Sequence, residues 1–251
     1  MLRALASSLR LAKRPIELAV RRGVAVSLYR TRGAQTTSAT KLRVSLPQPR
    51  FLNTAAPAAG GFSYPAPRSL DAVVNMELFA KESPESITKI WTEFHAASTS
   101  SMASVVSRED YKKMSQRGVA TPFFVIPVQR GEGFFSLLAQ YQGNSWLLTY
   151  LEDFKRDPST AQPYLCITAY TELELSKGLV LLRADVCALA TLNKEDAAKI
   201  LAQISTFYAD DAHYKYVFSF NKTPREFNFD EAHKAANAIT KYESSPSLAN
   251  N

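Results

Sequence analysis

Acidic residues are nearly absent from the start of the chain, where Glu17 is the only one before Asp71. Residues 1–50 contain eleven Lys and Arg, so they carry a formal charge of +10, and the rest of the 251-residue chain carries −3 of the total +7. A basic domain is the usual electrostatic signature of a nucleic-acid binder. Because the positive charge is confined to the first fifty residues, we expect no nucleic-acid partner for the domain that follows.

Long apolar runs and cysteine motifs are missing as well. No run of about 18 apolar residues occurs, so we expect no helix that spans a membrane and no stable membrane insertion. The two cysteines, Cys166 and Cys187, form no C-x-x-C motif, and so few cysteines suit a reducing compartment. The pair could be neighbours on adjacent strands, but buried, inert thiols are the favoured interpretation.

The signatures of common enzyme classes are also missing. The sequence has no G-x-x-x-x-G-K-[ST], no G-x-S-x-G and no H-E-x-x-H motif. None of the histidines is followed three or four residues later by another metal ligand. We therefore expect a protein that is not an enzyme, with no catalytic residues, no metal site and no cofactor.

The first segment does contain an amphipathic, Arg-rich pattern. Leu2, Leu5 and Leu9 recur at spacings of three and four, which places them on one stripe of a helix. Such a helix in an Arg- and Ser-rich, acid-poor segment is typical of a mitochondrial transit peptide, which we expect over residues 1–40. The alternative is a basic helix that stays in the mature protein and lies on a membrane surface.

The remainder of the chain divides into three parts by composition. Residues 41–68 are rich in Pro, Ala and Gly and have no apolar period, so we expect a linker there. Residues 69–242 are long enough for a single domain of ordinary size. The last nine residues, 243–251, are expected to be a disordered tail.

Capping residues predict helices on both sides of a central region. Ser83 followed by Pro84 marks a helix start. Ser107 and Asp110 resemble a capping pair, and Gly118 supplies a stop for the same helix. The expected helices cover residues 70–81, 84–96, 108–117, 194–209 and 229–240.

Short apolar, aromatic or β-branched runs separated by turn residues predict strands. The expected strands cover residues 122–128, 134–142, 145–154, 164–170, 178–186 and 213–221. The first three are joined by links too short for a parallel crossover, so they must be antiparallel neighbours. The predicted fold class is α+β, an antiparallel meander sheet of about six strands with helices packed before and after it in sequence.

Aromatic residues are the unusual feature, with Phe123-Phe124 and Phe134-Phe135 placed on either side of one turn. Because side chains alternate along a strand, the two members of each pair face opposite sides of the sheet. If helices cover only one face, an aromatic side chain is left for solvent or a partner. The alternative, that helices cover both faces, stays open. An aromatic surplus without catalytic motifs favours binding of another macromolecule.

Four motifs occur in a consistent order along the expected domain. They are Ile-Trp-x-x-x-His at Ile90 to His95, P-x-F-x-x-P-x-x-R-x-x-G at Pro122 to Gly133, K-G-[IL]-V-L-[ML] at Lys177 to Leu182, and P-x-E-F at Pro224 to Phe227. Together they resemble the mitochondrial ATP synthase assembly factor 1 family, from about Ser69 to Asp230. One departure is Ala139-Gln140, where the family has Gly-Gln.

The resemblance implies an assembly chaperone in the mitochondrial matrix. Such a protein binds the unassembled catalytic β subunit of F1, prevents its aggregation and is displaced by the α subunit. The candidate partner contacts are the aromatic side chains Phe124, Phe134, Phe135, Tyr141 and Trp146, with the alternative that most of them belong to the core. The alternative function is a matrix enzyme with a pocket between sheet and helices, using acids such as Glu152 and Asp185.

Overall fold

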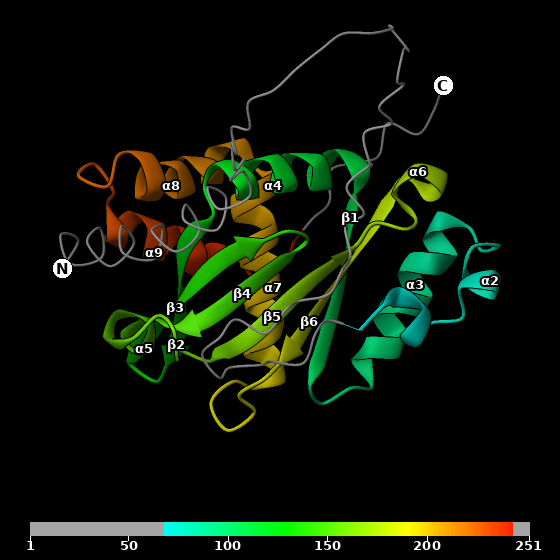
Figure 1. Ribbon diagram of the computed structural model, residues 1–251, viewed down its shortest axis with the longest axis horizontal. Helices are drawn as coiled ribbons and strands as arrows, with labels where there is room; N and C mark the ends of the chain where they lie inside the picture. Colours follow the sequence, from blue (N-terminus) through cyan, green and yellow to red (C-terminus); the bar gives the residue numbers. More distant parts are fainter. Residues whose placement is uncertain (1–67, 243–251) are drawn as a thin grey trace, which may run out of the picture.

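Residues 68–242 are the part of the chain that the computed structural model describes. The expected transit peptide over residues 1–40, nearly all of the linker and the tail over 243–251 lie outside the described residues. Within them, helices precede and follow one sheet, and further helices are inserted between strands (Figure 1). The predicted α+β class is confirmed.

Six strands form one antiparallel sheet in the order β1-β6-β5-β4-β3-β2. Their bounds are β1 Ser101–Ser107, β2 Phe123–Arg130, β3 Gly133–Gln142, β4 Ser145–Tyr150, β5 Pro163–Tyr170 and β6 Leu179–Val186. Tight turns join β2 to β3 and β3 to β4, and each needs a residue with positive φ. Gly131 (φ 53°) and Gly143 (φ 60°) supply these conformations without a steric penalty. The predicted meander is therefore confirmed from β2 to β6.

The helices differ widely in length. Their bounds are η1 Leu70–Ala72 (a 3₁₀ turn), α2 Met76–Phe79, α3 Pro84–Ala96, α4 Arg108–Ala120, α5 Leu151–Arg156, α6 Glu174–Lys177, α7 Lys194–Ala209, α8 Asp211–Lys222 and α9 Phe229–Ala238. The capping predictions for the longer ones are confirmed. The Ser83 hydroxyl accepts from the Ser86 N–H, and the Ser107 hydroxyl from the Asp110 N–H. Asn193 and Asp196 form a capping box at the start of α7.

The strand predicted over 213–221 is wrong, because this segment forms α8. Its aromatic residues alternate as in a strand, but Val217 and Phe220 also have the three-residue spacing of one helix face, and both are buried. The Asp210 carboxylate caps the helix by accepting from the His213 N–H. Local capping and burial of this face thus override the β propensity of the aromatic residues.

The sixth strand is β1, which the sequence pattern did not indicate. Its residues are mostly small, and it depends on pairing with β6, where Val105 lies opposite Leu181 and Val106 opposite Val180. Val106 is fully buried and Val105 only partly. A strand of this kind is specified by its neighbours more than by its own residues.

Two further elements are shorter than predicted. The helix expected over 70–81 is split into η1 and α2, because the Asn75 side chain accepts from the Leu78 N–H and starts a new helix. Ser69, the residue before η1, makes no side-chain cap bond. The strand expected over 145–154 ends at Tyr150, and the last four residues begin α5.

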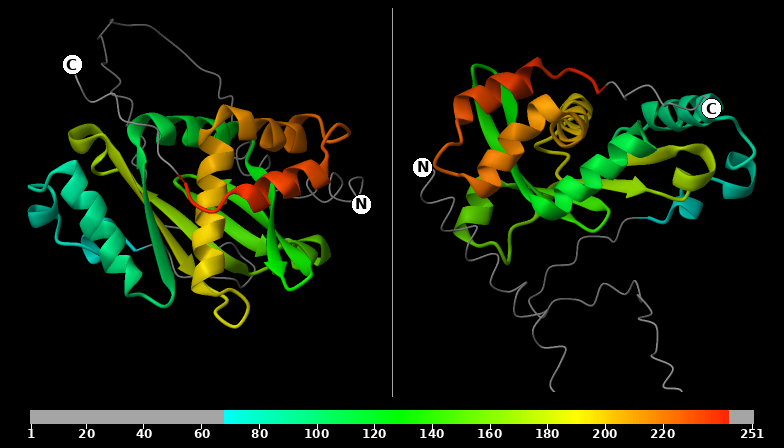
Figure 2. Two further views of the ribbon diagram at one scale, coloured as in Figure 1. Left: turned by 180° about the vertical axis from the view of Figure 1, so that it is seen from behind. Right: turned by 90° about the horizontal axis from the view of Figure 1, so that it is seen from above.

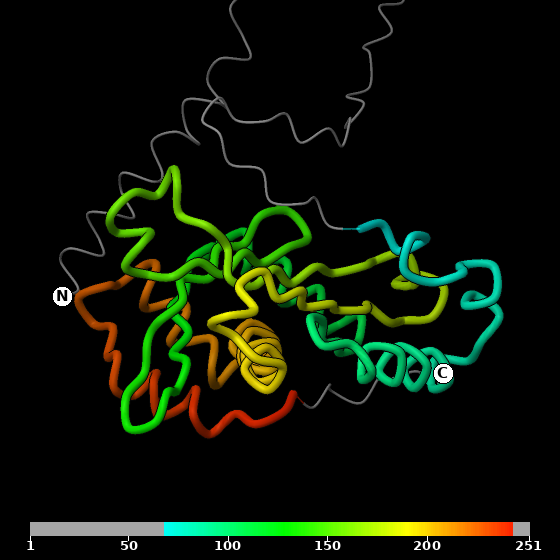
Figure 3. The backbone as a smooth tube through the Cα atoms, turned by 90° about the horizontal axis from the view of Figure 1, so that it is seen from below, coloured from blue at the N-terminus to red at the C-terminus, as the bar shows by residue number. Residues whose placement is uncertain are grey.

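One face of the sheet packs against α7, which crosses its middle (Figure 2). The strands curve around this helix, which Figure 3 shows almost end-on. Directly opposite residues Tyr141 and Trp146 share this face, and the Trp146 ring lies 5.8 Å from Tyr208 of α7. We call the buried side chains on this face, with those of α4, α5, α7, α8 and α9, the large core; its bulkiest members are Phe124, Trp146, Phe207 and Tyr208.

A second, smaller core lies on the opposite face, where α2 and α3 pack at the end of the sheet formed by β5, β6 and β1. We call it the small core; it contains Leu70, Phe79, Ile87, Trp91, Tyr170, Leu173 and Leu181. The Trp91 Nε1–H donates to the Leu182 carbonyl at 3.2 Å, and its ring meets Tyr170 edge-on at 5.9 Å. Helices therefore cover part of each face, so neither alternative for the aromatic pairs holds along the whole sheet.

The prediction that Gly118 ends α4 is wrong, because Gly118 lies inside the helix. A Cβ atom at this position would be 2.7 Å from the Tyr141 ring. The glycine therefore lets the helix backbone approach β3 directly. Its role is close packing of helix on sheet, and α4 continues to Ala120.

The β2 edge of the sheet is closed by α8. The Asn221 side chain donates to the Phe123 carbonyl at 2.6 Å and accepts from the Phe123 N–H at 3.3 Å. These are the backbone groups that point away from β3, since the neighbouring Pro122 carbonyl accepts from Tyr141 of β3. A side-chain amide thus takes the place of a further strand at this residue.

Candidate partner-binding groove

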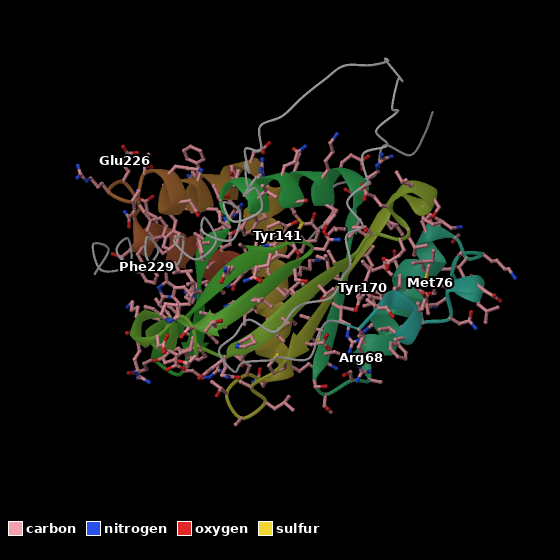
Figure 4. The ribbon with its side chains drawn as sticks, viewed as in Figure 1. Arg68, Met76, Tyr141, Tyr170, Glu226 and Phe229 are labelled. Carbon is pink, nitrogen blue, oxygen red and sulfur yellow. The ribbon has the colours of Figure 1, made fainter. Side chains whose placement is uncertain are left out.

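An apolar groove of about 500 Å³ opens at the β2–β3 end of the sheet, beside α5, α8 and the start of α9. Six aromatic side chains line it: Phe134, Phe135, Tyr150, Phe220, Phe227 and Phe229. We call this site the aromatic groove. Figure 4 shows Phe229 at one end of the long axis and Met76 of α2 at the other. The groove is therefore well separated from the small core.

The floor of the aromatic groove is continuous with the large core. Phe220 of α8 and Phe227 are buried and meet edge-on, with ring centres 5.2 Å apart. Phe124 touches both of them and lies 4.8 Å from Phe207 of α7. Interlocked rings of this kind leave little rotational freedom, so the floor is rigid.

Phe134 stands at the mouth of the groove and is 45% exposed. The tight turn after β2 places it at the start of β3, and α9 brings Phe229 alongside. The two rings stack with centres 5.7 Å apart, and the His233 ring lies 4.3 Å from Phe134. Two rings thus support Phe134, while part of its side chain faces solvent.

Phe135 points to the other face of β3 and is half-buried. Its ring meets Tyr150 edge-on at 6.0 Å, and the Arg130 guanidinium lies 5.2 Å from its centre. Arg130 also forms an ion pair with Asp196 of α7 at 2.6 Å and donates to the Thr191 carbonyl. These contacts fix the side of the groove next to α7.

Polar residues border the apolar surface. Glu152 and Lys155, one turn apart on α5, form an ion pair at 2.7 Å on the rim of the groove. An apolar centre with a polar border is the usual composition of a protein–protein interface. The groove has this composition on a scale that suits one or two side chains of a partner.

Three of the five candidate contacts lie inside the domain. Phe124, Tyr141 and Trp146 are 1%, 7% and 0% exposed, and all belong to the large core. The structure brings only Phe134 and Phe135 to the groove surface. The alternative, that most of the candidates are core residues, therefore fits these three. Alternation along a strand shows which side chains share a face of the sheet, but it does not show which face the helices cover.

A second apolar surface was missed by the sequence analysis. A groove of about 340 Å³ lies between α2 and α3, with Trp91 and Phe79 among its lining residues. We call it the α2–α3 groove; it is bordered by the exposed side chains of Leu78, Ile90 and Phe94. The sequence feature that could have indicated this groove is the apolar stripe of α3, which is wider than the face that the helix buries. Ile87 and Trp91 of this stripe are buried, whereas Ile90 and Phe94 are exposed.

The acids named for an enzyme are held in separate ion pairs. Glu152 pairs with Lys155 at the aromatic groove, and Asp185 pairs with Arg183 at 2.8 Å on β6. In the described part of the chain, no three His, Cys, Asp or Glu side chains gather as a metal site requires. Within residues 68–242, no helix is both long enough and apolar enough to cross a bilayer.

The paired acids at 210–211 have structural roles. Partial burial would raise the pKa of Asp210, but hydrogen bonds from His213 outweigh it and the pKa lies below its usual value. Asp211 forms an ion pair with Arg117, which also donates to the Tyr208 carbonyl at the end of α7. These groups stabilise the junction of α7 and α8 and the contact with α4.

The four motifs that suggested a family lie at structurally important places. Trp91 belongs to the small core and His95 packs against its ring. Pro122 to Gly133 forms β2 and its turn, Lys177 to Leu182 leads into β6, and Phe227 lies on the floor of the aromatic groove. The family model described as "ATP11 protein" matches residues 29–232. The chain belongs to the ATP11 family.

Curated relatives of this ATP11 chain are named ATP synthase mitochondrial F1 complex assembly factor 1. The human protein is 29% identical over 164 residues, 64% of this chain and 49% of the relative. The mouse protein is 29% identical over 175 residues, which are 69% of this chain and 53% of the relative. The zebrafish protein is 24% identical over 170 residues, which are 67% of this chain and 55% of the relative. The chain thus spans about half the length of the curated relatives it matches.

Proposed function

We propose that this protein is an assembly chaperone of mitochondrial ATP synthase, which binds the unassembled β subunit of F1 in the matrix and prevents its aggregation. Membership of the ATP11 family and the printed names of its relatives support a role in F1 assembly. The observation that carries the proposal is the aromatic groove, where Phe134 is exposed but held in place by Phe229. No second function is favoured by an observation of comparable weight.

The physical reason for such a protein lies in the β subunit. A subunit made to pack against α exposes apolar surface when it is alone, and such surface drives aggregation. A rigid aromatic side chain contributes a large contact area with little loss of conformational entropy. Phe134 has these properties, so we assign it the central contact and Phe135 a supporting one.

Release requires that the complex be weaker than the final assembly. If the α subunit covers the same surface of β more tightly, transfer to α proceeds downhill without an energy source. A single groove bordered by an ion pair fits this requirement better than an extensive apolar interface, because obligate interfaces are larger and more hydrophobic. We therefore propose that α displaces the chaperone by competition.

The test compares two exposed phenylalanines in the full chain. Phe134→Ser changes the aromatic groove, and Phe94→Ser changes the α2–α3 groove at a side chain that is 58% exposed. We expect Phe134→Ser to weaken β binding by about 30-fold, the effect of losing a contact worth about 2 kcal/mol. Phe94→Ser should bind as the unmodified chain does. Light scattering of β diluted from denaturant reports the suppression of aggregation.

Circular dichroism and urea unfolding of both variants show whether each is folded. A folded Phe134→Ser variant that suppresses aggregation fully would exclude the aromatic groove as the site. Failure of the unmodified chain to suppress it would contradict the chaperone function itself. Addition of α should release the chaperone from β in size-exclusion chromatography, and a stable complex of all three proteins would contradict displacement.

A further inference from the structure

The two cysteines lie side by side on one face of the sheet. Cys166 is in β5 and lies opposite Asp185 of β6, and Cys187 follows two residues after Asp185. Residues two apart along a strand point to the same face. The Cys187 N–H donates to the Tyr164 carbonyl at 2.9 Å, so the pairing of the two strands continues to this residue. As a result, the Cys166 and Cys187 Sγ atoms are 3.6 Å apart.

The two thiols differ in exposure. Cys166 is buried, as was expected of both thiols, but Cys187 is exposed just past the end of β6. A small oxidant in solution can therefore reach Cys187 first, while Cys166 stands behind it within contact distance. This is the arrangement of an attacking and a resolving cysteine.

The two thiols share a hydrogen bond between their sulfur atoms. Donation of a hydrogen bond from Cys166 lowers the pKa of Cys187, although burial and the Asp185 carboxylate act against this. The same bond, together with burial, raises the pKa of Cys166. Negative charge thus develops on the exposed sulfur, and the thiolate is the reactive form of cysteine.

We propose that Cys166 and Cys187 form an oxidant-sensitive dithiol site that closes reversibly into an intramolecular disulfide. The Cys187 thiolate attacks one oxygen of hydrogen peroxide; the O–O bond breaks, hydroxide leaves, and a sulfenic acid forms on Cys187. The Cys166 sulfur then attacks the Cys187 sulfur, and the sulfenic oxygen leaves as water with the Cys166 proton. Two thiols are oxidised by two electrons in all, and the peroxide is reduced to water.

Closing the bond requires only a small movement. A disulfide bond is about 2.05 Å long, so the sulfur atoms must approach by roughly 1.5 Å. Cys187 lies just past the end of β6, where the connection to α7 begins, so the movement can be confined to this end of the strand. The disulfide would attach the beginning of that connection to β5.

The test uses the full reduced chain and hydrogen peroxide, followed by alkylation under denaturing conditions and intact-mass measurement. We expect a monomer in which neither cysteine is alkylated and whose mass is lower by two hydrogens than that of the reduced chain. After reduction with dithiothreitol, both cysteines should be alkylated again. Digestion without reductant should give one cross-linked pair of peptides containing Cys166 and Cys187. A chain that keeps both thiols alkylatable, or that forms mainly intermolecular dimers, would overturn the proposal.

Two matched variants test the separate roles. Cys166→Ser should accumulate a sulfenic acid on Cys187 that dimedone traps, because the resolving thiol is missing. Cys187→Ser should leave Cys166 unlabelled over the same period, because Cys166 is buried. Equal labelling of the two variants would contradict the assignment of Cys187 as the attacking residue. The mass measurement on the unmodified chain does not depend on either variant.

Discussion

The two apolar grooves of the domain are built differently. The aromatic groove opens from the large core, and its floor is a set of interlocked rings that includes Phe220 and Phe227. The α2–α3 groove lies over the small core, and aliphatic side chains lie beside Phe79, Trp91 and Phe94 in its lining. The more exposed phenylalanine belongs to the second groove, since Phe94 is 58% exposed and Phe134 45%. Exposure alone would therefore select the wrong groove under the function proposed above.

The difference between the grooves is one of support. A helix of four residues, such as α2, is not stable by itself, so the α2–α3 groove depends on packing against Trp91. The aromatic groove is held by strand pairing and by ion pairs such as Arg130 with Asp196. A binding surface that is already ordered loses less entropy when it binds. The comparison favours the aromatic groove as the partner site, and the changes below test its physical basis.

The largest effect is expected from Trp91→Ala, which removes the centre of the small core. The side chain is fully buried and its Nε1–H donates to the Leu182 carbonyl. Truncation of a buried tryptophan costs about 3–5 kcal/mol, which urea unfolding measures as a loss in the free energy of unfolding. Hydrogen exchange should locate the loss mainly in residues 84–96, where α3 would detach, and leave the amides of β2 and β3 protected.

The matched change in the large core is Trp146→Ala, at a side chain that is equally buried. We expect a loss of similar size, but with faster exchange throughout β3, β4, β5 and α7, because all of these meet the large core. If Trp91→Ala accelerated exchange in these same elements, the two cores would form one cooperative unit. The contrast between a supported and a dependent groove would then fail.

A smaller effect is expected from Gly118→Ala, which tests how closely α4 approaches the large core. The new methyl group would meet the Tyr141 ring at 2.7 Å, so the helix must shift. Overpacking lowers the free energy of unfolding by about 1–3 kcal/mol, and the better helix propensity of alanine raises it by about 1 kcal/mol. The expected net loss is about 1 kcal/mol in the free energy of unfolding.

Val119→Ala is the control, because Val119 is the next residue of α4 and is 74% exposed. It should change the free energy of unfolding by less than about 0.5 kcal/mol. A stability equal to or above that of the unmodified chain for Gly118→Ala would mean that α4 can move away from β3 at little cost. The large core would then be less rigid than the aromatic groove requires.

The elements that could be predicted from the sequence are those with local signals. Ser83 and Pro84 fix the start of α3, and glycines with positive φ fix the turns of the meander. The strand β1 could not be predicted, since its pairing with β6 depends on residues far away in the chain. The segment of α8 fits two periods, and only the capping by Asp210 and the burial of one face decide between them.

The candidate site could be predicted only in part, for a similar reason. The doublet Phe134-Phe135 indicated that one ring faces each side of β3, and this is correct. The support of the exposed ring could not be predicted, because α9 brings Phe229 against Phe134 from almost a hundred residues away. The exposed Ile90 and Phe94 were missed because an apolar stripe on a helix is ordinarily buried.

The smallest effect is a pH dependence that distinguishes the small core from the large one. His95 is 1% exposed, and its Nδ1–H donates to the Trp91 carbonyl at 2.9 Å. Burial is the main cause that lowers the pKa of His95, and the nearby Arg183 acts in the same direction, while the hydrogen bond to the Trp91 carbonyl and the charge of Asp185 oppose it. Protonation would place a charge on Nε2, which has no hydrogen-bond partner among the described residues.

The lowered pKa fixes the sign of the effect. The pKa of an unfolded histidine is about 6.5, so below that pH the unfolded chain binds a proton that the folded chain does not. Stability is therefore full above about pH 6.5 and falls as the pH decreases toward the lower pKa of the folded state. Urea unfolding at pH 7.5 and 5.5 should show a smaller loss for His95→Asn than for the unmodified chain, because asparagine does not titrate. Equal losses in the two proteins would place the acid sensitivity elsewhere and remove this distinction between the cores.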